Sequence, residues 1–477
     1  MQLFFEGAIV GIFTGVVVAA LRFLLDEADI YRPIIFAQVG GSGIPQIKKV
    51  LQGQAQMIKP FRLLLIKFFA TVLAIGVMIL FAKILAKAIK FDAQVSGSGI
   101  PQLKGILQGR AQMVKPFRLL AVKFFATVLA IGAGMSLGRA GISVQFGAAI
   151  GNFFTKIIYA GNKQHEAVEG NFLLTAGAGA GLAAIFNAPL AGVIFCIEEL
   201  RKRFSQEILI AAVTAAVMAS FVVKIVFGVR PVFETITATT LNMPTVITLP
   251  NLEMITAMSA APLKFAALFI LLGIICGAVG AIFSKALIFA LDTYDRLKIF
   301  GVKRFAIPLL LAIPLGIEIP QILGCGNVLV DEILVTHLAL GMLIILLAGK
   351  ILFTLISFGT NAPGGLFLPV LVIGALNGNI FARIGNEMHL FTADWTTLFI
   401  IFGMAAFFAA VVKAPVTGSI LILELTGQFS HLVGLIIVSG VAFLISDLCG
   451  GEPIFSALLN RTQKKVTGEN SSVTKIF

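Results

Sequence analysis

The sequence predicts an all-α polytopic membrane protein, built from many tilted and broken helices. Of its 477 residues, 58% are hydrophobic and only 12% are charged, and the mean hydropathy is +1.01. A soluble domain has roughly a quarter of its residues charged, because polar side chains must cover its surface. The composition therefore excludes a disordered chain, a nucleic-acid-binding protein and an ordinary cytosolic enzyme.

Apolar runs recur along the chain, and several approach the roughly 20 residues that a helix needs to cross a bilayer. The longer runs are Leu3–Leu25, Leu63–Leu85, Phe172–Ile197, Ile208–Phe227, Phe265–Leu291, Leu338–Phe358 and Leu432–Leu448. Shorter runs at Ala306–Ile317 and Leu366–Leu376 are interrupted by Gly or Pro. Irregular backbone at membrane depth is tolerated only where protein buries it or where it lines a cavity. The shorter runs therefore predict broken helices around an internal site.

One block of the N-terminal region occurs twice. Ala37–Gly76 matches Ala93–Gly132 at an offset of 93 − 37 = 56, with 8 differences in 40 positions and hence 32 identities. Solenoid units repeat three or more times, so a tandem duplication explains the pair better. Only the second copy runs into the Gly-rich stretch that follows, and we assign function to that copy. We expect residues 1–93 to form a membrane helix plus the first copy, 94–449 the membrane core, and 450–477 a short cytoplasmic tail without a regulatory domain.

The net charge of +13 lies in short loops beside apolar runs. Three groups of basic residues stand out: Lys48, Lys49, Lys59 and Arg62; Arg201, Lys202 and Arg203; and Arg461, Lys464 and Lys465. The positive-inside rule places these loops and the C-terminus in the cytoplasm. We expect a multi-pass protein of the plasma (inner) membrane, with the bilayer and not nucleic acid as its partner.

The sequence offers no pattern for a metal or a cofactor. The four cysteines are far apart and form no CxxC, and the four histidines form no HExxH. No Ser/His/Asp or paired-acid site lies at membrane depth either, which disfavours a polytopic membrane enzyme.

Four Gly/Pro-containing loops each lie at the start of an apolar helix-like segment. They are Gly97–Pro101, Gly138–Ile142, Gly364–Pro369 and a later stretch that ends at Phe429. A helix start presents unpaired N–H groups and about half a positive charge, which suits an anion. Any one loop alone is better explained as a kink or a small-residue helix contact. Four together predict an internal anion site that lacks a fixed full charge and therefore releases its ion readily.

These loops resemble the signature motifs of the CLC family of chloride channels and proton-coupled chloride transporters. The matching segments, in the family's order, are GSGIPQ (Gly97–Gln102), GMSLGRAGISVQFGAAIG (Gly134–Gly151), LAAIFNAPLAGVIFCIEEL (Leu182–Leu200), APGGLFLPVLVIGAL (Ala362–Leu376) and GMAAFFAAVVKAPVTGSILILELTG (Gly403–Gly427). The resemblance implies the CLC fold, with broken helices around an internal anion site, and a homodimer with one pore per subunit.

The resemblance also implies which residues bind the anion. They are Gly97, Ser98, Gly99, Arg139, Ala140, Gly141, Leu366, Phe367, Leu368 and Phe429. Ser98 would offer its hydroxyl, and chloride-preferring members have Ser here where nitrate-preferring members have Pro. The N–H groups of Leu366 and Phe367 would complete the central site. Those around Arg139–Gly141, with Phe367 and Leu368, would form the outer site.

Two positions depart from the family pattern. Members that gate or couple to protons carry Glu in a GREGP motif, whereas this chain reads GRAGI, so Ala140 stands at the gating position. The family usually closes the central site with a Tyr hydroxyl, at a position that corresponds here to Phe429. Without the acid, the resemblance implies passive chloride conduction with weak pH gating.

Two acids remain to be assigned. The resemblance maps a cytoplasmic proton relay onto Glu199, whereas the alternative is a helix-end carboxylate paired with the basic cluster Arg201–Arg203. Glu424 corresponds to an acid that is chiefly structural in the family. The leading hypothesis is passive, channel-like transport of chloride or a similar small anion, of the class termed voltage-gated chloride channel activity. The alternatives are a proton-coupled antiporter that uses a substitute acid and a non-conducting family relative.

Overall fold

The computed structural model describes residues 2–40, 79–90, 93–111, 113, 116–160, 163–228, 262–336, 338–392, 395–427 and 429–468. Within these residues the regular structure is helical, apart from one isolated β-bridge between Gly138 and Gly365. The all-α prediction is therefore confirmed. Most of the first copy of the duplicated block lies outside the described residues, so the role expected of that copy stays a prediction.

Five helices of the described part are long and apolar enough to cross a membrane. They are α1 (Gln2–Gly40), α9 (Gln206–Phe227), α12 (Pro262–Arg296), α15 (Leu340–Gly359) and α16 (Phe367–Glu387). Shorter apolar helices lie among them, including α17 (Thr396–Val412), α18 (Pro415–Thr426) and α19 (Leu432–Leu448). Full-length and shorter helices occur together, as the apolar runs predict. The two runs expected to be broken, Ala306–Ile317 and Leu366–Leu376, are instead parts of continuous helices, α13 (Val302–Glu318) and α16.

The predicted run Phe172–Ile197 is broken in the structure. Helix α7 (Lys163–Phe186) stops at Asn187, whose φ of 53° is left-handed, and α8 begins at Pro189 and ends at Phe195. Proline fits the first helical turn, where its missing N–H costs nothing. A π-helical turn, η2 (Cys196–Arg201), then carries Glu198 and Glu199.

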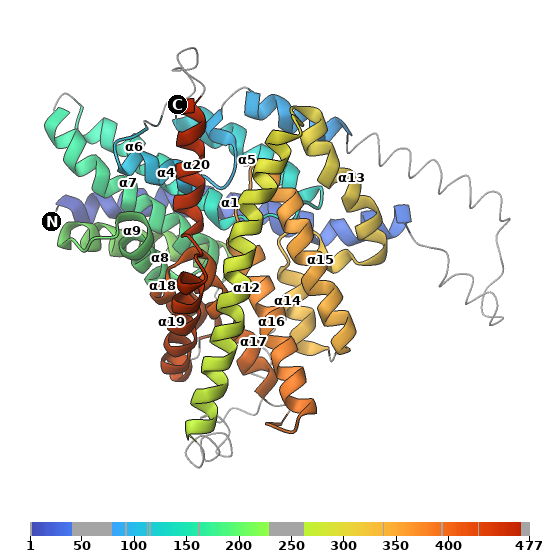
Figure 1. Cartoon of the computed structure of the whole chain (residues 1–477). Coiled ribbons are helices and arrows are strands. Elements are labelled where there is room, and N and C mark those ends of the chain that lie inside the picture. The colour runs from blue at the N-terminus through green and yellow to red at the C-terminus, as the bar shows by residue number, and fades with distance from the viewer. Residues whose placement is uncertain are drawn as a thin grey trace.

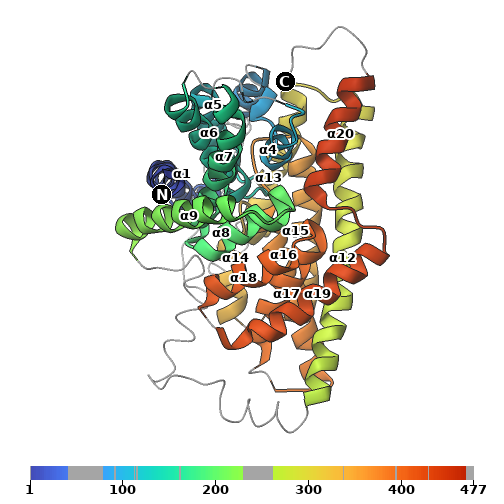
Figure 2. The same ribbon diagram turned by 90° about the vertical axis from the view of Figure 1, so that its left-hand side faces the viewer.

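Besides the tandem duplication, the chain contains a second repeat, in which two sets of helices follow each other in the same order with opposite orientation. Helices α4 (Ile100–Leu107), α5 (Pro116–Gly132), α6 (Ala140–Ile158), α7 and α8 are matched in order by α14 (Asn327–Val335), α15, α16, α17 and α18. Figures 1 and 2 show α6 and α7 in the upper part of the molecule and α16 and α17 in the lower part. Gly138 and Gly365 exchange two N–H···O bonds of 2.6 Å, one in each direction. The two halves therefore meet through a reciprocal pair of backbone hydrogen bonds between equivalent glycines, 365 − 138 = 227 residues apart.

Backbone angles at equivalent positions support the repeat. Gly99 and Gly326, which are 326 − 99 = 227 residues apart, precede α4 and α14 with φ of 89° and 93°. Ala188 and Ala414 precede α8 and α18 with φ/ψ of −127°/78° and −131°/75°. The two halves therefore use the same turns to start equivalent helices.

Each half supplies a carboxylate that caps a helix of the other. Glu424, in α18, accepts N–H bonds from Leu190 (2.9 Å) and Ala191 (2.7 Å) at the start of α8. Glu198 accepts N–H bonds from Val416 (3.0 Å) and Thr417 (2.6 Å) at the start of α18. Carboxylates satisfy the unpaired N–H groups of a helix start and are stabilised by its dipole. The structural role expected of Glu424 is therefore seen, with Glu198 as its counterpart.

Glycines let the helices of each half pack in close contact. A methyl group built on Gly147 of α6 would lie 1.8 Å from the carbonyl oxygen of Gly177 in α7. One on Gly378 of α16 would lie 2.0 Å from that of Phe399 in α17. In a membrane, where lipid is as apolar as leucine, this close backbone packing is a main source of helix association.

We expect Gly147→Ala to destabilise the protein, because the added methyl must push α6 away from α7. Overpacking of this kind typically costs about 1–3 kcal/mol, which thermal unfolding in detergent will show as a lower midpoint. The matched control is Gly440→Ala in α19, where a methyl group meets no atom within 4 Å. Equal midpoints for the two variants would contradict the packing argument.

Candidate anion site

Three of the predicted loops meet at the centre of the molecule. Gly138 and Gly365 are joined by their paired hydrogen bonds, and the Gly97 N–H donates to the carbonyl of Asn361 at 3.1 Å. A methyl group built on Gly141 would lie 2.9 Å from the Cβ of Ser98. The starts of α4, α6 and α16 therefore converge, as the sequence predicts for the first three loops.

The Ser98 hydroxyl has the properties of a ligand-binding group. The side chain is 1% exposed, and its oxygen makes no hydrogen bond within the described residues. A buried polar group left unpaired costs about 1–3 kcal/mol. The N–H groups of Leu366 and Phe367, at the start of α16, also have no acceptor within their own helix. An anion in contact with these groups would satisfy them all.

The loop that carries Ser98 is held by a buried lysine. Lys123 of α5 is fully buried, and its Nζ donates to Oε1 of Gln145 at 2.5 Å and to the carbonyl of Gln94 at 3.4 Å. The Gln145 side chain in turn packs against Gly99. Lys350 of α15, at 350 − 123 = 227 residues further on, is also fully buried and donates to the carbonyls of Ile322 and Gly324, both at 2.9 Å. These lysines fix the loops and so place the helix starts.

The start of α6 carries no titratable side chain toward the site. Ala140 is its first residue and is fully buried. The guanidinium of Arg139 donates to the carboxylate of Asp26 in α1, which also pairs with Arg22. What α6 offers an anion is therefore its backbone N–H groups and the partial charge of its helix dipole.

The prediction that Phe429 closes the central site is wrong. Phe429 begins the short helix η5 (Phe429–His431) after α18 ends, and its side chain is 66% exposed. Four other aromatic rings lie beside Phe367, those of Phe186, Phe195, Phe408 and Phe455. The Phe455 ring is the stacked one, with centroids 5.9 Å apart and planes 21° apart. Phe455 is fully buried near the start of α20 (Ile454–Gly468).

A signal for Phe455 was present in the sequence. Gly450, Gly451 and Pro453 precede its helix, which is the same Gly/Pro pattern that marks the other loops. Ile454 and Phe455, which follow the expected boundary at residue 449, are fully buried in the hydrophobic core. The first residues of the expected tail therefore pack against the rest of the fold, and the assignment of 450–477 to a cytoplasmic tail stays a prediction.

Glu199 has an ion-pair partner that its neighbouring residues in the sequence did not predict. It is fully buried, and its Oε1 accepts a hydrogen bond from Nζ of Lys104 at 2.6 Å. Lys104 lies on α4 and also donates to Oγ of Ser456, the residue after Phe455, at 2.9 Å. The ion-pair partner is thus not the basic cluster Arg201–Arg203. A lone basic residue in an otherwise apolar helix was the available sign.

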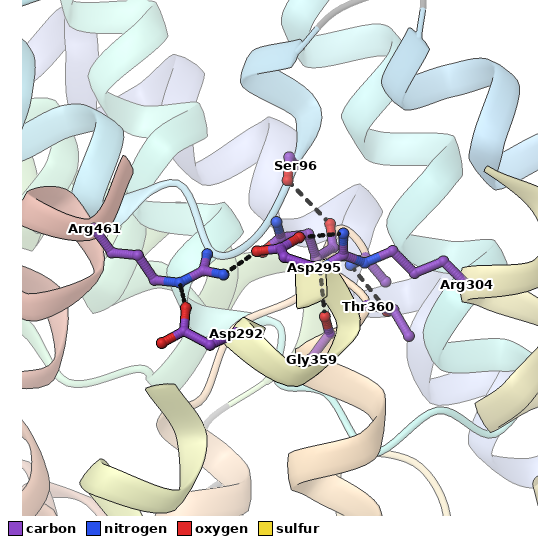
Figure 3. A network of polar contacts seen from close by, with 9 residues as sticks. Ser96, Asp292, Asp295, Arg304, Gly359, Thr360 and Arg461 are labelled. Atoms are coloured by element: carbon purple, nitrogen blue, oxygen red, sulfur yellow. Dashed lines mark hydrogen bonds and ion pairs between the residues drawn. The ribbon is translucent and has the colours of Figure 1, made fainter. Parts of the chain in front are cut away.

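A second polar network holds α20 and the loop before α16 (Figure 3). Arg461 of α20 pairs with Asp292 of α12 at 2.7 Å and also with Asp295. Arg304 of α13 (Val302–Glu318) pairs with Asp295 at 3.0 Å and donates to the carbonyl of Gly359 at 2.8 Å. The network therefore connects the helix that carries Phe455 to the loop that leads to Leu366.

The described residues contain no cluster of three His, Cys, Asp or Glu side chains that would hold a metal ion. Cys196, Cys276 and Cys325 are buried and separate, and Cys449 is exposed.

Known proteins are similar to this chain both in sequence and in fold. Residues 76–447 match the family described as voltage gated chloride channel. The H(+)/Cl(-) exchange transporter ClcA of Vibrio cholerae is 36% identical over 384 residues, which cover 79% of this chain and 76% of that protein. The family match begins before residue 94, where we expected the core to start.

Two solved structures have the same fold. A slow cyanobacterial Cl−/H+ antiporter gives a TM-score of 0.78 at 28% identity, over 98% of this chain and 99% of that one. A eukaryotic CLC transporter gives 0.72 at 20% identity, over 97% and 74%, and shows the fold alone. With the family match spanning most of the chain, this integral membrane protein belongs to the voltage gated chloride channel, or CLC, family.

Proposed function

We propose that the protein conducts chloride, or a similar small anion, passively across the membrane through one pathway per subunit. Ala140 carries this proposal, because a buried methyl group stands at the start of α6 where a carboxylate would compete with the anion. Chloride is the anion named for the relatives from Vibrio cholerae and the cyanobacterium.

The other groups at the site suit a permeating anion. Ser98 offers an unpaired hydroxyl, and the starts of α6 and α16 offer backbone N–H groups. The nearby positive side chains, Arg139 and Lys123, are already bonded to Asp26 and Gln145. Conduction requires binding that is strong enough for the ion to enter and weak enough for it to leave. Partial charges from helix ends meet that requirement better than a free ammonium group would.

The absence of an acid at position 140 also removes a proton carrier from the anion's path. A glutamate there could bind a proton and swing, whereas a methyl group can do neither. Glu199, the remaining acid at the predicted relay position, is held in an ion pair with Lys104. Proton movement is therefore not tied to anion movement in this proposal.

A proton-coupled antiporter is the second candidate, and one observation favours it. Glu199 is fully buried, and its Oε2 has no hydrogen-bond partner within the described residues. Intramembrane acids commonly serve proton transfer, and the relatives named above exchange protons for chloride. In this version Glu199 would exchange protons and another acid would replace the one missing at Ala140.

We also propose that two copies associate as a homodimer in the plasma (inner) membrane, each with its own anion pathway. Helices α9, α18 and α19 expose apolar side chains suited to such contact or to lipid, among them Val217 and Phe221, Val416, and Val433 and Ile436.

Flux from reconstituted vesicles tests the function directly. We expect a chloride gradient to dissipate without moving protons uphill, because no carboxylate at the site alternates with chloride. Chloride efflux is followed with an electrode while external pH is recorded in the same sample. Proton pumping driven by chloride would overturn passive conduction and establish the antiporter. No flux from well-folded protein would establish a non-conducting relative.

The Ala140→Glu variant probes the gating position. At about pH 7 the new carboxylate is ionised and competes with chloride, whereas at about pH 4 it becomes protonated. We expect chloride flux to be about tenfold lower at the higher pH, which corresponds to roughly 1.4 kcal/mol of competition. Ala140→Gln is the matched control, since an amide has similar size and does not titrate. Equal pH profiles for the two variants would contradict the assigned position.

The Ser98→Pro variant tests the central hydroxyl. It removes the donor and, by the family pattern, shifts preference toward nitrate. A hydrogen bond to a charged group is worth about 1.5–3 kcal/mol, so chloride binding should weaken about tenfold or more. Calorimetric titration with chloride and nitrate measures both effects. Ser42→Pro, in the first copy of the duplicated block, is the control, and a matching effect there would mean that function belongs to that copy.

The Phe455→Tyr variant tests which ring adjoins the site. The new hydroxyl would lie at the ring that stacks on Phe367, and we expect chloride to bind several-fold more tightly. Phe429→Tyr places the same hydroxyl on an exposed ring and should leave binding unchanged. The reverse result in calorimetry would restore Phe429 to the site.

A further inference from the structure

Arg304 is a buried cation that lies outside the anion-binding loops. It belongs to the first turn of α13 and is 8% exposed. Its guanidinium donates to the carbonyl of Gly359 at 2.8 Å and to Asp295 at 3.0 Å (Figure 3). We propose that Arg304 is a positioning residue for anion binding, which fixes the turn after α15 and through it the Ser98 hydroxyl. The inference rests on the proposed role of Ser98 and holds for a channel and an antiporter alike.

The bonds that lead from Arg304 to the Ser98 loop are continuous. Gly359 is the last residue of α15, where backbone carbonyls have no partner within the helix. Two residues later, the carbonyl of Asn361 accepts the N–H of Gly97 at 3.1 Å. Gly97 directly precedes Ser98. A displaced end of α15 would therefore move the residue from which the Ser98 backbone continues.

The turn after α15 needs support from its surroundings. Asn361 has a φ of 60°, in the left-handed region that disfavours residues with a side chain. Such a conformation persists where the surrounding structure holds it in place. Arg304 holds the helix end just before this residue. The hydroxyl of Ser96 donates to the Asn361 carbonyl at 3.1 Å and so holds the turn from the other half of the fold.

The inverted repeat forms an equivalent turn without an arginine. Gly324 donates to the carbonyl of Gly134 at 2.9 Å, and this bond corresponds to the one that holds the Ser98 loop, since 324 − 97 = 227 and 361 − 134 = 227. Gly134 has a φ of 97°, which a glycine adopts without a steric penalty. The residue at the position equivalent to Arg304, with 304 − 77 = 227, is Val77, which has no charge.

The two equivalent loops differ in what they offer an anion. Cys325 takes the place of Ser98, since 325 − 98 = 227, and a thiol is a weaker hydrogen-bond donor than a hydroxyl. Arg304 thus accompanies the loop that carries the hydroxyl. Helix packing alone does not explain this pairing, because the fold closes the other turn without a charge.

The test measures chloride binding by calorimetric titration of the full-length protein in detergent. We expect Arg304→Gln to weaken chloride binding about fivefold, because the carbonyl of Gly359 loses its charged donor. In a Ser98→Ala background the same substitution should have no further effect, since the hydroxyl that it positions is gone. Arg304→Lys keeps a charge and three donors, and it should bind chloride within about twofold of the wild type.

The matched control is Asp292→Asn. It removes the ion pair with Arg461, at 2.7 Å in the same network, and leaves the bond from Arg304 to Gly359 in place. Equal weakening by this variant would overturn the inference, because a general loosening of the network would then explain the effect. An effect of Arg304→Gln that persists at full size without the Ser98 hydroxyl would also overturn it.

Thermal unfolding and gel filtration establish that each variant is folded before titration. If Arg304→Gln does not fold, Ser96→Ala removes the other support of the Asn361 carbonyl and should weaken chloride binding about twofold. Unchanged binding by that variant would overturn the inference. A Ser98→Ala variant that binds chloride as tightly as the wild type would instead overturn the proposed anion site itself.

Discussion

The two hydrogen bonds between Gly138 and Gly365 are the constraint on which the rest of the site depends. They fix the start of α6 against the start of α16, at the point where the two halves of the fold meet. Any side chain at Gly365 would meet the backbone N of Gly141 at 3.0 Å. Because the two helix starts are joined by backbone alone, their N–H groups face a common point without a side chain between them.

Electrostatic balance around that point follows one rule. Each full charge nearby is bonded to a protein partner, such as Arg139 to Asp26 and Lys104 to Glu199. The unsatisfied groups are weak ones, namely the hydroxyl of Ser98 and the first N–H groups of the helices. The protein therefore supplies a mobile anion with many partial charges, whereas its own full charges serve to hold helices together.

The sequence predicted much of this arrangement and missed parts of it for physical reasons. Hydropathy and the Gly/Pro loops located most helices and the three loops that converge, because both signals are local. The family resemblance then pointed to Ser98, Ala140 and Phe367 within those loops. Phe455 was missed because counting along the chain led to Phe429, whereas the end of α18 leaves that ring at the surface. The partner of Glu199 was missed because Lys104 is 95 residues away. The inverted repeat was missed because its two halves share backbone turns and glycine positions more than they share sequence identity.

The exchanged carboxylates of Glu198 and Glu424 impose an order on biosynthesis. The capping contacts span 234 and 218 residues of chain, so α8 is made long before the carboxylate that completes it. At roughly 5–20 residues per second, the ribosome needs about ten to fifty seconds to reach Glu424. During that time the N–H groups at the start of α8 must be satisfied by water or by the insertion machinery. The contact that caps α8 can therefore form only after the second half of the chain has been made.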